Sequence, residues 1–548
     1  MVDANPYRGL TYARALDRLA SHWGPREALV FGERRWTFAE VRAEIDRASA
    51  RLAALGLEPG DKVAIWMPNR PEFLWTWFGA SQMGLVAVFI NTRLRHDEFV
   101  YQIAQSDARL VVVPGSGAFR DFLGELVGAC PELRTQEPGR LGSRAFPQLM
   151  AVACLDPAPP GLAGVLDWSQ PPGDGLPVPA PAEHHDKPAL IAYSSGTTAL
   201  PKGAMLTHCI WRKAFDGGMR IGLGPDDGLY LCVPLFGVLG SLNGIMTFWT
   251  HGAKVVLDER FDSVRALSTI ERERLTAMHL LPAMIYQMIE HSRFGEFDLR
   301  ALRVGVVLSS DPAVLRDAAE RLGMRGVVTG YGLTESTGLV TRVSWTDPLE
   351  IRLASQGTPL PDCPIRVVDP ETLRDLPPGE QGEIWIGGYS IMPGYYNKPE
   401  ETRTAITPDG WLRSGDAGCL TPEGAVVFKH RLKDGYKHKG FNVSTPEVES
   451  VAARHPPVRA VAVVGVPDRR WGEIGVAFVI PRSPAAFDAG EFLRYLGEHL
   501  AGFKLPEHVF VVEEFPLTGG TDKIQKFKLR EQAKALLAKA PAMVRSQN

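Results

Sequence analysis

The sequence predicts an α/β fold, with a large N-terminal domain of parallel and mixed sheets and flanking helices, followed by a small α+β domain. Three observations support this prediction. The chain has 548 residues, more than one hydrophobic core usually accommodates. Over the first three-quarters, short apolar segments alternate with helical patterns, which is typical of parallel sheets. After about residue 432, the order of strands and helices is that of a small α+β domain.

The first expected elements are a capped helix and two buried strands. Thr37 and Glu40 have the spacing of a capping box, and helical periodicity continues from them to Leu55. Apart from Lys62 at the start, residues 62–67 and 110–113 are apolar throughout, which is typical of strands that are covered on both faces. These segments therefore predict layered helices and strands near the N-terminus.

The uncharged stretch 73–90 could be mistaken for a membrane span. It reaches about the 18-residue length at which a bilayer helix is considered. Glycines and polar residues interrupt it, however, up to Gly84. We therefore expect a helix that ends near Gly84 and a buried strand at 85–90, with no integral membrane segment.

Residues 131–188 are rich in proline and glycine, so we expect this segment to form a surface excursion outside the core. A strand at 189–192 follows. Near the C-terminus, a helix is expected to start at Ser444 or Thr445, with Pro446 in its first turn. The remaining segments predict strands at 460–466, 476–480 and 509–512 and a helix at 491–500. The predicted domains are therefore residues 1–432 and 433–548.

Composition limits the function classes. The formal net charge of −3 gives no indication of a nucleic-acid partner. The N-terminus resembles neither a signal peptide nor a transit peptide. The cysteines are scattered without a CxxC pair, at positions Cys130, Cys154, Cys209, Cys232, Cys363 and Cys419. This spacing favours reduced thiols in a cytoplasmic protein over a zinc site or a disulfide framework. A homodimer is compatible with these observations.

The strongest local motif is a glycine- and hydroxyl-rich loop at residues 193–203, YSSGTTALPKG. It follows the strand at 189–192 and ends with Lys202. Backbone N–H groups, hydroxyls and one cation in such a loop can surround phosphates. The loop is not a Walker A motif, because the Gly–Lys–Ser/Thr ending is absent.

This loop resembles the phosphate-binding signature of the ANL superfamily, which comprises acyl-CoA synthetases, adenylation domains and luciferases. Ala199 stands where that signature usually has glycine. The resemblance extends over nearly the whole chain. It implies that the loop binds ATP and AMP through Ser194, Ser195, Gly196, Thr197, Thr198 and Lys202.

Residues 331–335, YGLTE, look like the family's YGxTE motif. The resemblance implies that Tyr331 stacks on adenine, that Gly332 and Thr334 lie at the nucleotide, and that Glu335 holds Mg²⁺. A carboxylate oxygen suits this role because Mg²⁺ prefers oxygen ligands. Residues 410–416, GWLRSGD, look like GWxxTGD. By that likeness, Asp416 accepts hydrogen bonds from the ribose hydroxyls and Arg431 reaches the same sugar.

Residues 430–449 resemble the family's hinge and the segment after it. The family rotates its small domain between two half-reactions, and Lys433 matches the pivot position. Gly440 matches the glycine beside the pantetheine tunnel. The cationic strip at 437–439 is suited to coenzyme A phosphates. The coenzyme A residues implied are Lys437, Lys439, Gly440 and Phe441.

Residues 516–526, PLTGGTDKIQK, are similar to the family's PxTxxGKIxK motif, whose lysine contacts the carboxylate and the α-phosphate during adenylation. Lys523 matches that catalytic lysine. The loop is one residue longer than usual, and Asp522 replaces the glycine before the lysine. Lys526 is the alternative assignment.

The expected acyl pocket departs from the family pattern in two places. PLFGVLG at 234–240 looks like PLFHxxG, but Gly237 replaces the histidine and leaves space. Residues 309–312, SSDP, replace a GGAP turn and add polar bulk, including Asp311, whose orientation the sequence leaves open. The pocket residues implied by the resemblance are Phe236, Gly237, Leu239, Ser309, Ser310 and Leu333.

The resemblance implies an AMP-forming acyl-CoA synthetase that uses ATP, coenzyme A, Mg²⁺ and a hydrophobic carboxylic acid, either fatty (medium- or long-chain) or aromatic. The small domain is then expected to be mobile. Three alternatives stay open: an acyl-AMP ligase that loads a carrier protein, a luciferase-like oxygenase, and a degenerate nucleotide-binding homologue. The departures at Ala199, Gly237, Asp311 and Asp522 keep the last of these open.

Overall fold

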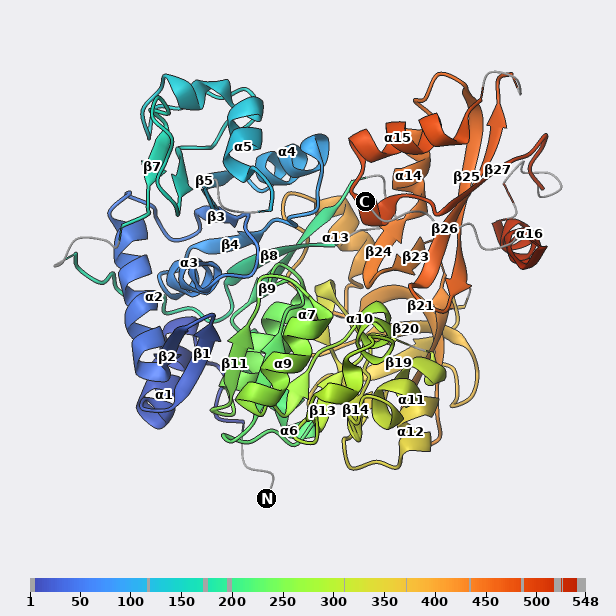
Figure 1. The fold of residues 1–548 in the computed structure, drawn as a ribbon, viewed down its shortest axis with the longest axis horizontal. Coiled ribbons are helices and arrows are strands. Elements are labelled where there is room, and N and C mark those ends of the chain that lie inside the picture. The colour runs from blue at the N-terminus through green and yellow to red at the C-terminus, as the bar shows by residue number, and fades with distance from the viewer. Residues whose placement is uncertain are drawn as a thin grey trace. The chain divides into compact units, whose positions relative to one another are not determined.

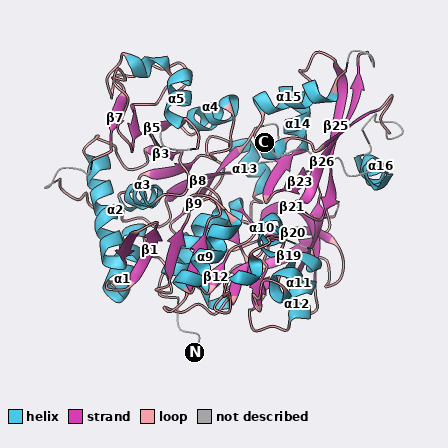
Figure 2. Cartoon of the chain, viewed as in Figure 1, coloured by secondary structure: helices cyan, strands magenta, loops and turns pink. Residues whose placement is uncertain are grey.

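The computed structural model describes residues 5–115, 119–170, 176–194, 200–309, 311–370, 372–432, 435–483, 487–516, 524 and 526–539. The chain divides into two compact units. Unit 1 comprises residues 1–92, 99–194 and 202–430, and unit 2 comprises 93–98, 195–201 and 431–548. The α/β fold class predicted from the sequence is confirmed (Figures 1 and 2). The predicted domain boundary at about residue 433 and the mobility of the small domain stay predictions.

One sheet of unit 1 contributes many residues to its hydrophobic core. In the described chain this sheet has seven strands. Every pair of neighbouring strands is parallel except β1–β2, which is antiparallel. Short apolar segments such as KVVL and GVV form these strands because helices cover them. In spatial order the strands are β14 (Gly326–Val328), β13 (Val304–Val306), β12 (Ala277–Met278), β10 (Gly228–Leu231), β11 (Lys254–Leu257), β1 (Glu27–Phe31) and β2 (Arg34–Thr37).

A second sheet of unit 1, with seven described strands, ends at the phosphate loop. It is parallel except for its last pair, β8–β9. Its order is β7 (Val165–Asp167), β6 (Ala151–Cys154), β5 (Ala108–Val113), β3 (Lys62–Ile65), β4 (Val86–Phe89), β8 (Pro188–Ser194) and β9 (Lys202–Thr207).

The interpretation of residues 131–188 as a surface excursion is wrong for its middle part. β6, Ala151–Cys154, is fully buried and pairs with β5 inside the sheet. The apolar tetrapeptide AVAC is long enough to pair with the apolar β5 and bury its side chains. The prolines and glycines around it therefore mark turns within the layer.

The capped helix predicted near the N-terminus is confirmed. Thr37 and Glu40 form both hydrogen bonds of a capping box at the start of α2, Phe38–Ala53. The uncharged stretch forms α3, Pro71–Gln82, followed by β4, and both pack inside unit 1. Among the described residues, no helix is long and apolar enough to cross a membrane. All six cysteines lie within the described ranges and are free thiols.

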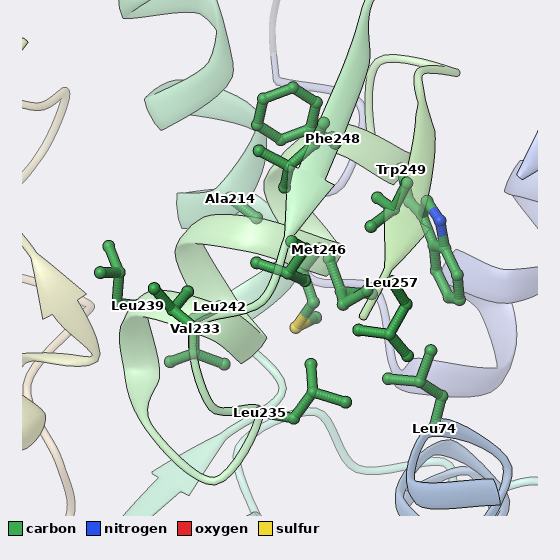
Figure 3. Packing of buried hydrophobic residues seen from close by; sticks show 14 of the residues in the cluster. Leu74, Ala214, Val233, Leu235, Leu239, Leu242, Met246, Phe248, Trp249 and Leu257 are labelled. Atoms are coloured by element: carbon green, nitrogen blue, oxygen red, sulfur yellow. The ribbon is translucent and has the colours of Figure 1, made fainter. Parts of the chain in front are cut away.

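The other α-helices before residue 430 connect the strands along the chain. They are α1 (Tyr12–Trp23), α4 (His96–Gln105), α5 (Phe122–Ala129), α6 (Ile210–Arg220), α7 (Val238–Gly240), α8 (Thr247–Trp249), α9 (Ser263–Glu273), α10 (Pro282–Ile289), α11 (Pro312–Glu320), α12 (Leu349–Ala354) and α13 (Pro399–Ala405). Figure 3 shows how Leu235, Leu242 and Met246 join the buried apolar cluster.

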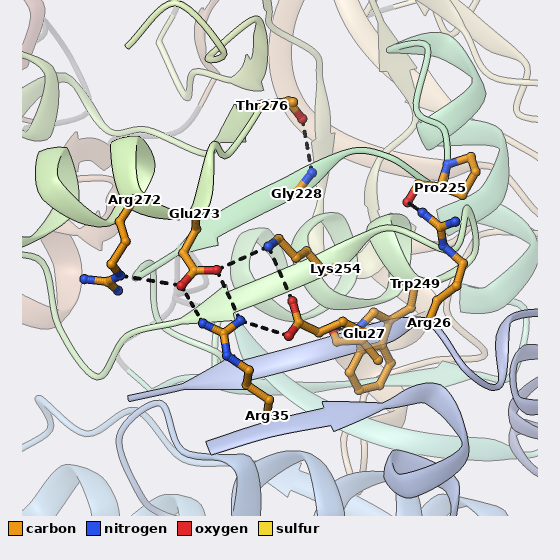
Figure 4. A network of polar contacts seen from close by, with 11 residues as sticks. Arg26, Glu27, Arg35, Pro225, Gly228, Trp249, Lys254, Arg272, Glu273 and Thr276 are labelled. Carbon is orange, nitrogen blue, oxygen red and sulfur yellow. Dashed lines mark hydrogen bonds and ion pairs between the residues drawn. The ribbon is translucent and has the colours of Figure 1, made fainter. Parts of the chain in front are cut away.

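Glu273, at the end of α9, is the centre of an ion-pair network that joins α9 to the first sheet (Figure 4). Its carboxylate pairs with Arg35 on β2 at 2.7 Å and with Lys254 on β11 at 3.2 Å. Glu27 on β1 contacts the same two cations. Hydrogen bonding to Arg35 lowers the pKa of Glu273 from 4.5 to about 2. The network therefore stabilises the edge of the sheet at neutral pH.

Glu273→Gln should lower the free energy of unfolding at pH 7 by about 1–2 kcal/mol, because half-exposed Arg35 is partly screened by solvent. The folded carboxyl has a lowered pKa, so its stabilisation is complete above pH 4.5 and disappears as pH falls toward 2. Thermal unfolding of both proteins from pH 7 downward should show the difference shrinking below pH 4.5. Glu290→Gln, at an exposed position without an ion pair in the described chain, is the control. An equal effect of both substitutions would contradict the assignment.

A smaller antiparallel sheet follows in the chain, with four described strands. It consists of β19 (Ile365–Val368), β20 (Gly382–Ile386), β21 (Leu412–Leu420) and β22 (Val426–Arg431). Two short hairpins precede it, β15 (Gly332–Leu333) with β16 (Gly338–Leu339) and β17 (Thr341–Arg342) with β18 (Thr358–Pro359).

Unit 2 contains a sheet with apolar residues packed on both faces. Its order is β24 (Phe441–Ser444), β23 (Gly435–His438), β26 (Gly472–Pro481) and β25 (Val458–Asp468), and β27 (His508–Val511) pairs with β26. The helices α14 (Thr445–Ala452), α15 (Ala489–His499) and α16 (Lys526–Lys539) complete the described part. Ser444 caps α14 as expected, with Pro446 in the first turn.

Candidate active site

Ser194 and Lys202 stand at the two ends of the predicted phosphate loop. β8 ends at Ser194, β9 begins at Lys202, and these residues are register partners in the antiparallel pair. Strand pairing therefore holds the loop at its base. The expected phosphate contacts of the loop itself stay predictions because its central residues lie outside the described residues, namely Ser195, Gly196, Thr197 and Thr198.

Glu335 lies beside this loop base. Its Oε1 accepts hydrogen bonds from Ser194 Oγ at 2.6 Å and from Tyr395 Oη at 2.7 Å. The ammonium group of Lys202 lies 4.6 Å from the ring centroid of Tyr395. No described residue donates a hydrogen bond to Oε2 of Glu335. The structure thus brings three predicted nucleotide residues together around Tyr395, with one carboxylate oxygen left for a ligand.

The hairpin that carries Glu335 depends on close backbone contact. A Cβ at Gly332 would lie 2.1 Å from the carbonyl oxygen of Gly338, so only glycine fits at this position of β15. The short helix η4, Thr334–Ser336, forms the turn of the hairpin. Thr334 lies at its start and is partly exposed.

Lys213 on α6 fixes the end of this turn. Thr337 has a left-handed backbone (φ +60°), which costs a β-branched residue about 1–2 kcal/mol. The ammonium group of buried Lys213 donates to the carbonyl oxygens of Ser336, Thr337 (2.8 Å) and Gly338 (3.0 Å). Burial lowers the pKa of Lys213 to about 7, whereas three carbonyl acceptors favour the charged form. The lysine thereby stabilises the strained turn behind Glu335.

Tyr331 and Asp416 are in direct contact. The Tyr331 hydroxyl donates to Asp416 Oδ2 at 2.8 Å, and the Tyr331 ring stacks on Phe428 at a centroid distance of 6.1 Å. Asp416 lies on β21, where its backbone N–H donates to Ser414 Oγ. The residues expected at adenine and ribose are therefore adjacent. Arg431 ends β22, and its side chain lies outside the described part.

The expected acyl wall begins with an extended segment. Gly237 has φ −95° and ψ 146°, a backbone that any residue adopts. An added Cβ would meet only the Pro234 carbonyl oxygen within 4 Å, at 3.5 Å. Phe236 is partly buried and Leu239 is buried in the same cluster, while Leu333 lies partly buried on β15. The surroundings of Gly237 therefore leave room for an added Cβ, and its place in an acyl pocket stays a prediction.

A π-helix follows this wall. η2, Ser241–Met246, winds with the wider π-helical geometry that often occurs at functional sites. Asn243 fixes it through Arg342, whose Nη2 donates to Asn243 Oδ1 at 2.7 Å. His279 Nδ1 accepts from the Val306 N–H, so its Nε2–H donates to the Asn243 carbonyl oxygen at 2.8 Å. Burial lowers the pKa of His279 to about 4, so the ring is neutral in this network.

The orientation of Asp311, which the sequence leaves open, is that of a helix cap at the surface. Asp311 is an exposed N-cap of α11, where its carboxylate accepts from the Ala313 N–H at 2.9 Å. Its own N–H donates to Ser309 Oγ at 3.0 Å. Asp311 therefore serves to start a helix, and its carboxylate is exposed there. Ser310 lies outside the described residues.

Comparisons with known proteins identify the family. A model described as "AMP-binding enzyme" matches residues 16–396, and one described as "AMP-binding enzyme C-terminal domain" matches residues 447–520. This chain belongs to the AMP-binding enzyme family. Within the ANL superfamily it is an acyl-CoA synthetase, an AMP-forming acid–CoA ligase.

Three relatives illustrate this membership. The enzyme is 31% identical to the mitochondrial medium-chain acyl-CoA ligase ACSF2 of Danio rerio, over 98% of this chain and 90% of that protein. It is 33% identical to the 3-[(3aS,4S,7aS)-7a-methyl-1,5-dioxo-octahydro-1H-inden-4-yl]propanoyl:CoA ligase of Mycobacterium tuberculosis, over 95% and 98%. The amide bond synthetase McbA of Marinactinospora thermotolerans has a similar structure, with a TM-score of 0.81, 28% identity and coverage of 95% and 99%.

In unit 2 of the synthetase, Gly440 has a structural role of its own. Lys439 (φ +51°) and Gly440 (φ +83°) form the two-residue turn of the β23–β24 hairpin, in which His438 pairs with Phe441. Hairpin turns with two positive φ angles strongly favour glycine. The turn alone therefore explains a glycine at 440, and its predicted place beside the pantetheine stays a prediction.

The cationic strip is engaged with an acidic residue. Lys439 Nζ lies 3.4 Å from Glu507 Oε1 and 4.5 Å from the ring centroid of Trp471. His438 is fully buried, and its Nε2 lies 3.4 Å from the same carboxylate. The Lys437 N–H donates to Glu473, and Phe441 packs on Phe503 with ring centroids 4.5 Å apart. A coenzyme A phosphate would have to compete with Glu507 for Lys439.

The two lysines with predicted catalytic roles, Lys523 and Lys433, lie outside the described residues. The alternative Lys526 is described and forms contacts within unit 2. Its Nζ lies 2.7 Å from Glu449 Oε1 and donates to Thr445 Oγ1 at 3.0 Å. These contacts give Lys526 a structural role at the start of α16.

Sequence reasoning missed three residues of this site: Tyr395, Lys213 and Arg342. The sequence does single out Lys213, because a lysine on the apolar face of a helix is unusual. It lies one turn from Ile210 and one turn from Gly217. Tyr395 and Arg342 carried no comparable signal, because only the tertiary fold brings them to Glu335 and Asn243.

Proposed function

We propose that this synthetase activates a hydrophobic carboxylic acid, a medium- or long-chain fatty acid or an aromatic acid, and transfers the acyl group to coenzyme A. The first half-reaction forms an acyl adenylate from the acid and ATP and releases pyrophosphate. The second forms the thioester and releases AMP. The observation that carries the proposal is the cluster of Ser194, Glu335 and Tyr395 at the base of the phosphate loop.

The residues fit a Mg²⁺ ion at Glu335. Its Oε1 is held by two hydroxyls, and its Oε2 has no donor among the described residues, so this oxygen suits a hard cation. The described residues contain no group of three acidic, histidine or cysteine side chains that could hold a metal without a substrate. Glu335 would therefore bind the ion together with ATP phosphates. When bound, Mg²⁺ would offset phosphate charge.

The other residues act on the nucleotide and the thiol. Tyr331 would contact adenine, and Asp416 would accept hydrogen bonds from ribose while the Tyr331 hydroxyl orients its carboxylate. Arg431 would reach the same ribose. Lys523 would bind the carboxylate and the α-phosphate during adenylation. For the second step, Lys433 would act as the pivot that brings Gly440 to the thiol.

The acyl wall supports a large apolar substrate. Gly237 leaves space, and Leu239 and Leu333 add apolar surface. The medium-chain and polycyclic acids in the names of the relatives are compatible with such a pocket. The homodimer and the cytoplasmic location expected from the sequence stay predictions.

A panel of acids tests the proposal. Pyrophosphate release and thioester formation are measured with fatty acids of increasing length and with aryl acids, with and without coenzyme A. The proposal requires both products with at least one hydrophobic acid. Adenylate formation without transfer to coenzyme A would point to a carrier-protein acceptor, and nucleotide binding without pyrophosphate release would point to a degenerate homologue.

Gly237→His should shift preference toward smaller acids. The backbone at 237 accepts any residue, so the variant is expected to fold and to fill the open space with imidazole. Each buried methylene contributes about 0.8 kcal/mol, so losing room for two or three carbons should lower kcat/KM for large acids by about 10–50-fold.

The measurement is kcat/KM over a chain-length and ring-size series for both proteins. Gly295→His is the matched control, because an added Cβ there meets nothing within 4 Å and residue 295 lies in the exposed turn η3 (Phe294–Glu296). Parallel profiles for wild type and Gly237→His would rule out a pocket role for position 237.

A further inference from the structure

Tyr395 touches two oppositely charged side chains of the site with different parts of its own side chain. Its hydroxyl donates to Glu335 Oε1 at 2.7 Å, and its ring centroid lies 4.6 Å from the ammonium group of Lys202. The residue is 7% exposed, so both contacts are largely shielded from solvent. Tyr395 therefore links the carboxylate expected at Mg²⁺ to the cation expected at the phosphates.

Lys202 and Glu335 start close enough to neutralise each other. Lys202 is the register partner of Ser194, so the Cβ atoms of this pair are about 5 Å apart. Ser194 Oγ in turn donates to Glu335 Oε1 at 2.6 Å. The flexible four-carbon stem of lysine could therefore bring its ammonium group to the carboxylate. Among the described residues, however, Lys202 and Glu335 form no ion pair with each other, and Oε1 accepts from the two hydroxyls instead.

An ion pair between these two side chains would weaken both ligand contacts. Glu335 is 9% exposed, so solvent would screen its attraction to an ammonium group only weakly. A divalent cation would then have to displace Lys202 from the carboxylate, and a phosphate oxygen would have to displace Glu335 from the ammonium group. A site that binds both partners of the Mg²⁺–ATP complex therefore needs a group that keeps the two charges apart.

The backbone around Tyr395 fixes its position against both partners. Tyr395 forms an antiparallel bridge with Ala204 of β9, the strand that begins at Lys202. Its N–H donates to Thr402 Oγ1 at 2.9 Å. The same segment reaches the Glu335 turn, because the Met392 N–H donates to the Glu335 carbonyl oxygen at 2.9 Å. Backbone contacts therefore hold the tyrosine in place in addition to the contacts of its side chain.

We propose that Tyr395 is a positioning residue that prevents Lys202 and Glu335 from pairing, so that the carboxylate stays available to Mg²⁺ and the ammonium group to the phosphates of ATP. The hydroxyl occupies Oε1 of Glu335 and leaves Oε2 to the cation, while the ring holds the ammonium group by a cation–π contact. This proposal rests on the proposed function, because it takes Glu335 as the Mg²⁺ ligand.

The test measures metal binding directly and does not depend on turnover. Mn²⁺ replaces Mg²⁺, and its binding is followed by electron paramagnetic resonance in the presence of saturating α,β-methylene-ATP, which cannot release pyrophosphate. Tyr395→Phe keeps the ring and loses the hydroxyl, so Mn²⁺ should bind about 10-fold more weakly, as is usual when a hydrogen-bond partner of a metal ligand is lost. Tyr395→Leu loses both contacts, and the affinity should fall about 100-fold.

Lys202→Met determines whether an ion pair causes this loss. In the Tyr395→Leu enzyme, the second substitution removes the competing cation and should restore Mn²⁺ affinity about 10-fold. In the wild-type background the same substitution should change Mn²⁺ affinity much less, because Tyr395 already separates the two charges. A merely structural role of Tyr395 would not produce this difference between the two backgrounds.

Tyr396→Phe is the matched control. Tyr396 is the next residue, and its hydroxyl donates to Asp107 Oδ2 at 2.8 Å. The substitution also removes one tyrosine hydroxyl with a carboxylate partner, but this carboxylate is not the expected metal ligand. Mn²⁺ affinity and pyrophosphate release should both stay near wild type.

Two results would overturn the proposal: wild-type Mn²⁺ affinity in Tyr395→Phe, or an equal effect of Lys202→Met in both backgrounds. The affinity does not depend on the fraction of folded enzyme, and Tyr395→Phe retains the aromatic packing, so this variant decides the matter even if Tyr395→Leu does not fold. Failure of the proposed function looks different, because then the wild-type enzyme would bind no Mn²⁺ with the analogue, or would release no pyrophosphate from ATP with any acid.

Discussion

Replacing Lys523 with alanine should slow adenylation about 10²–10³-fold, because one positioned donor would be lost where negative charge develops at the α-phosphate. Thioester formation from preformed acyl adenylate should change little, since the small domain is expected to have removed this lysine by then. Pyrophosphate exchange measures the first step, and acyl transfer from synthetic adenylate measures the second.

Lys526→Ala is the control for this prediction. Lys526 contacts Glu449 and Thr445 within unit 2, so its loss should lower stability and reduce both half-reactions to a similar, small extent. If Lys526→Ala instead abolishes adenylation while Lys523→Ala does not, the catalytic lysine is Lys526. The longer loop and Asp522 would then have shifted the motif by three residues along the chain.

Lys213→Met should destabilise unit 1 by about 2–4 kcal/mol, because three buried carbonyl oxygens lose their donor while the cost of burying one charge disappears. The strained turn at Thr337 would lose its anchor, so Glu335 should be less well placed. We expect a lower Tm and a raised KM for ATP. Chemical denaturation and ATP-dependent pyrophosphate release measure the two effects.

Lys534→Met provides the comparison for that substitution. Lys534 is half-exposed on α16 and, within the described ranges, pairs only with Glu531 three residues earlier, an interaction that contributes about 0.5 kcal/mol or less. Its loss should leave both Tm and KM for ATP near wild type. A Lys213→Met enzyme of unchanged stability would show that the hairpin does not depend on the buried ammonium group.

The sequence predicted those parts of the fold that local chemistry specifies. Thr37 and Glu40 define a capping box within four residues, and Ser444 with Pro446 defines the start of α14 in the same way. The apolar segments at 62–67 and 110–113 correspond to β3 and β5. The observed β3 ends two residues before the predicted strand, and the observed β5 begins two residues before it. β6 was missed because four apolar residues among prolines and glycines carry too little periodicity to distinguish a buried strand from a loop.

The order of the motifs along the chain determined the family, because each is a short run of neighbouring residues whose types are fixed by the ligand. Only the tertiary structure decided which side chains meet: Tyr395 reaches Glu335 from 60 residues away, and Arg342 reaches Asn243 from 99 residues away. It also decided that Asp311 caps a helix at the surface and that Gly440 forms a hairpin turn. The physical reason is that burial and hydrogen-bond partners depend on residues distant in sequence, whereas a motif depends on its neighbours alone.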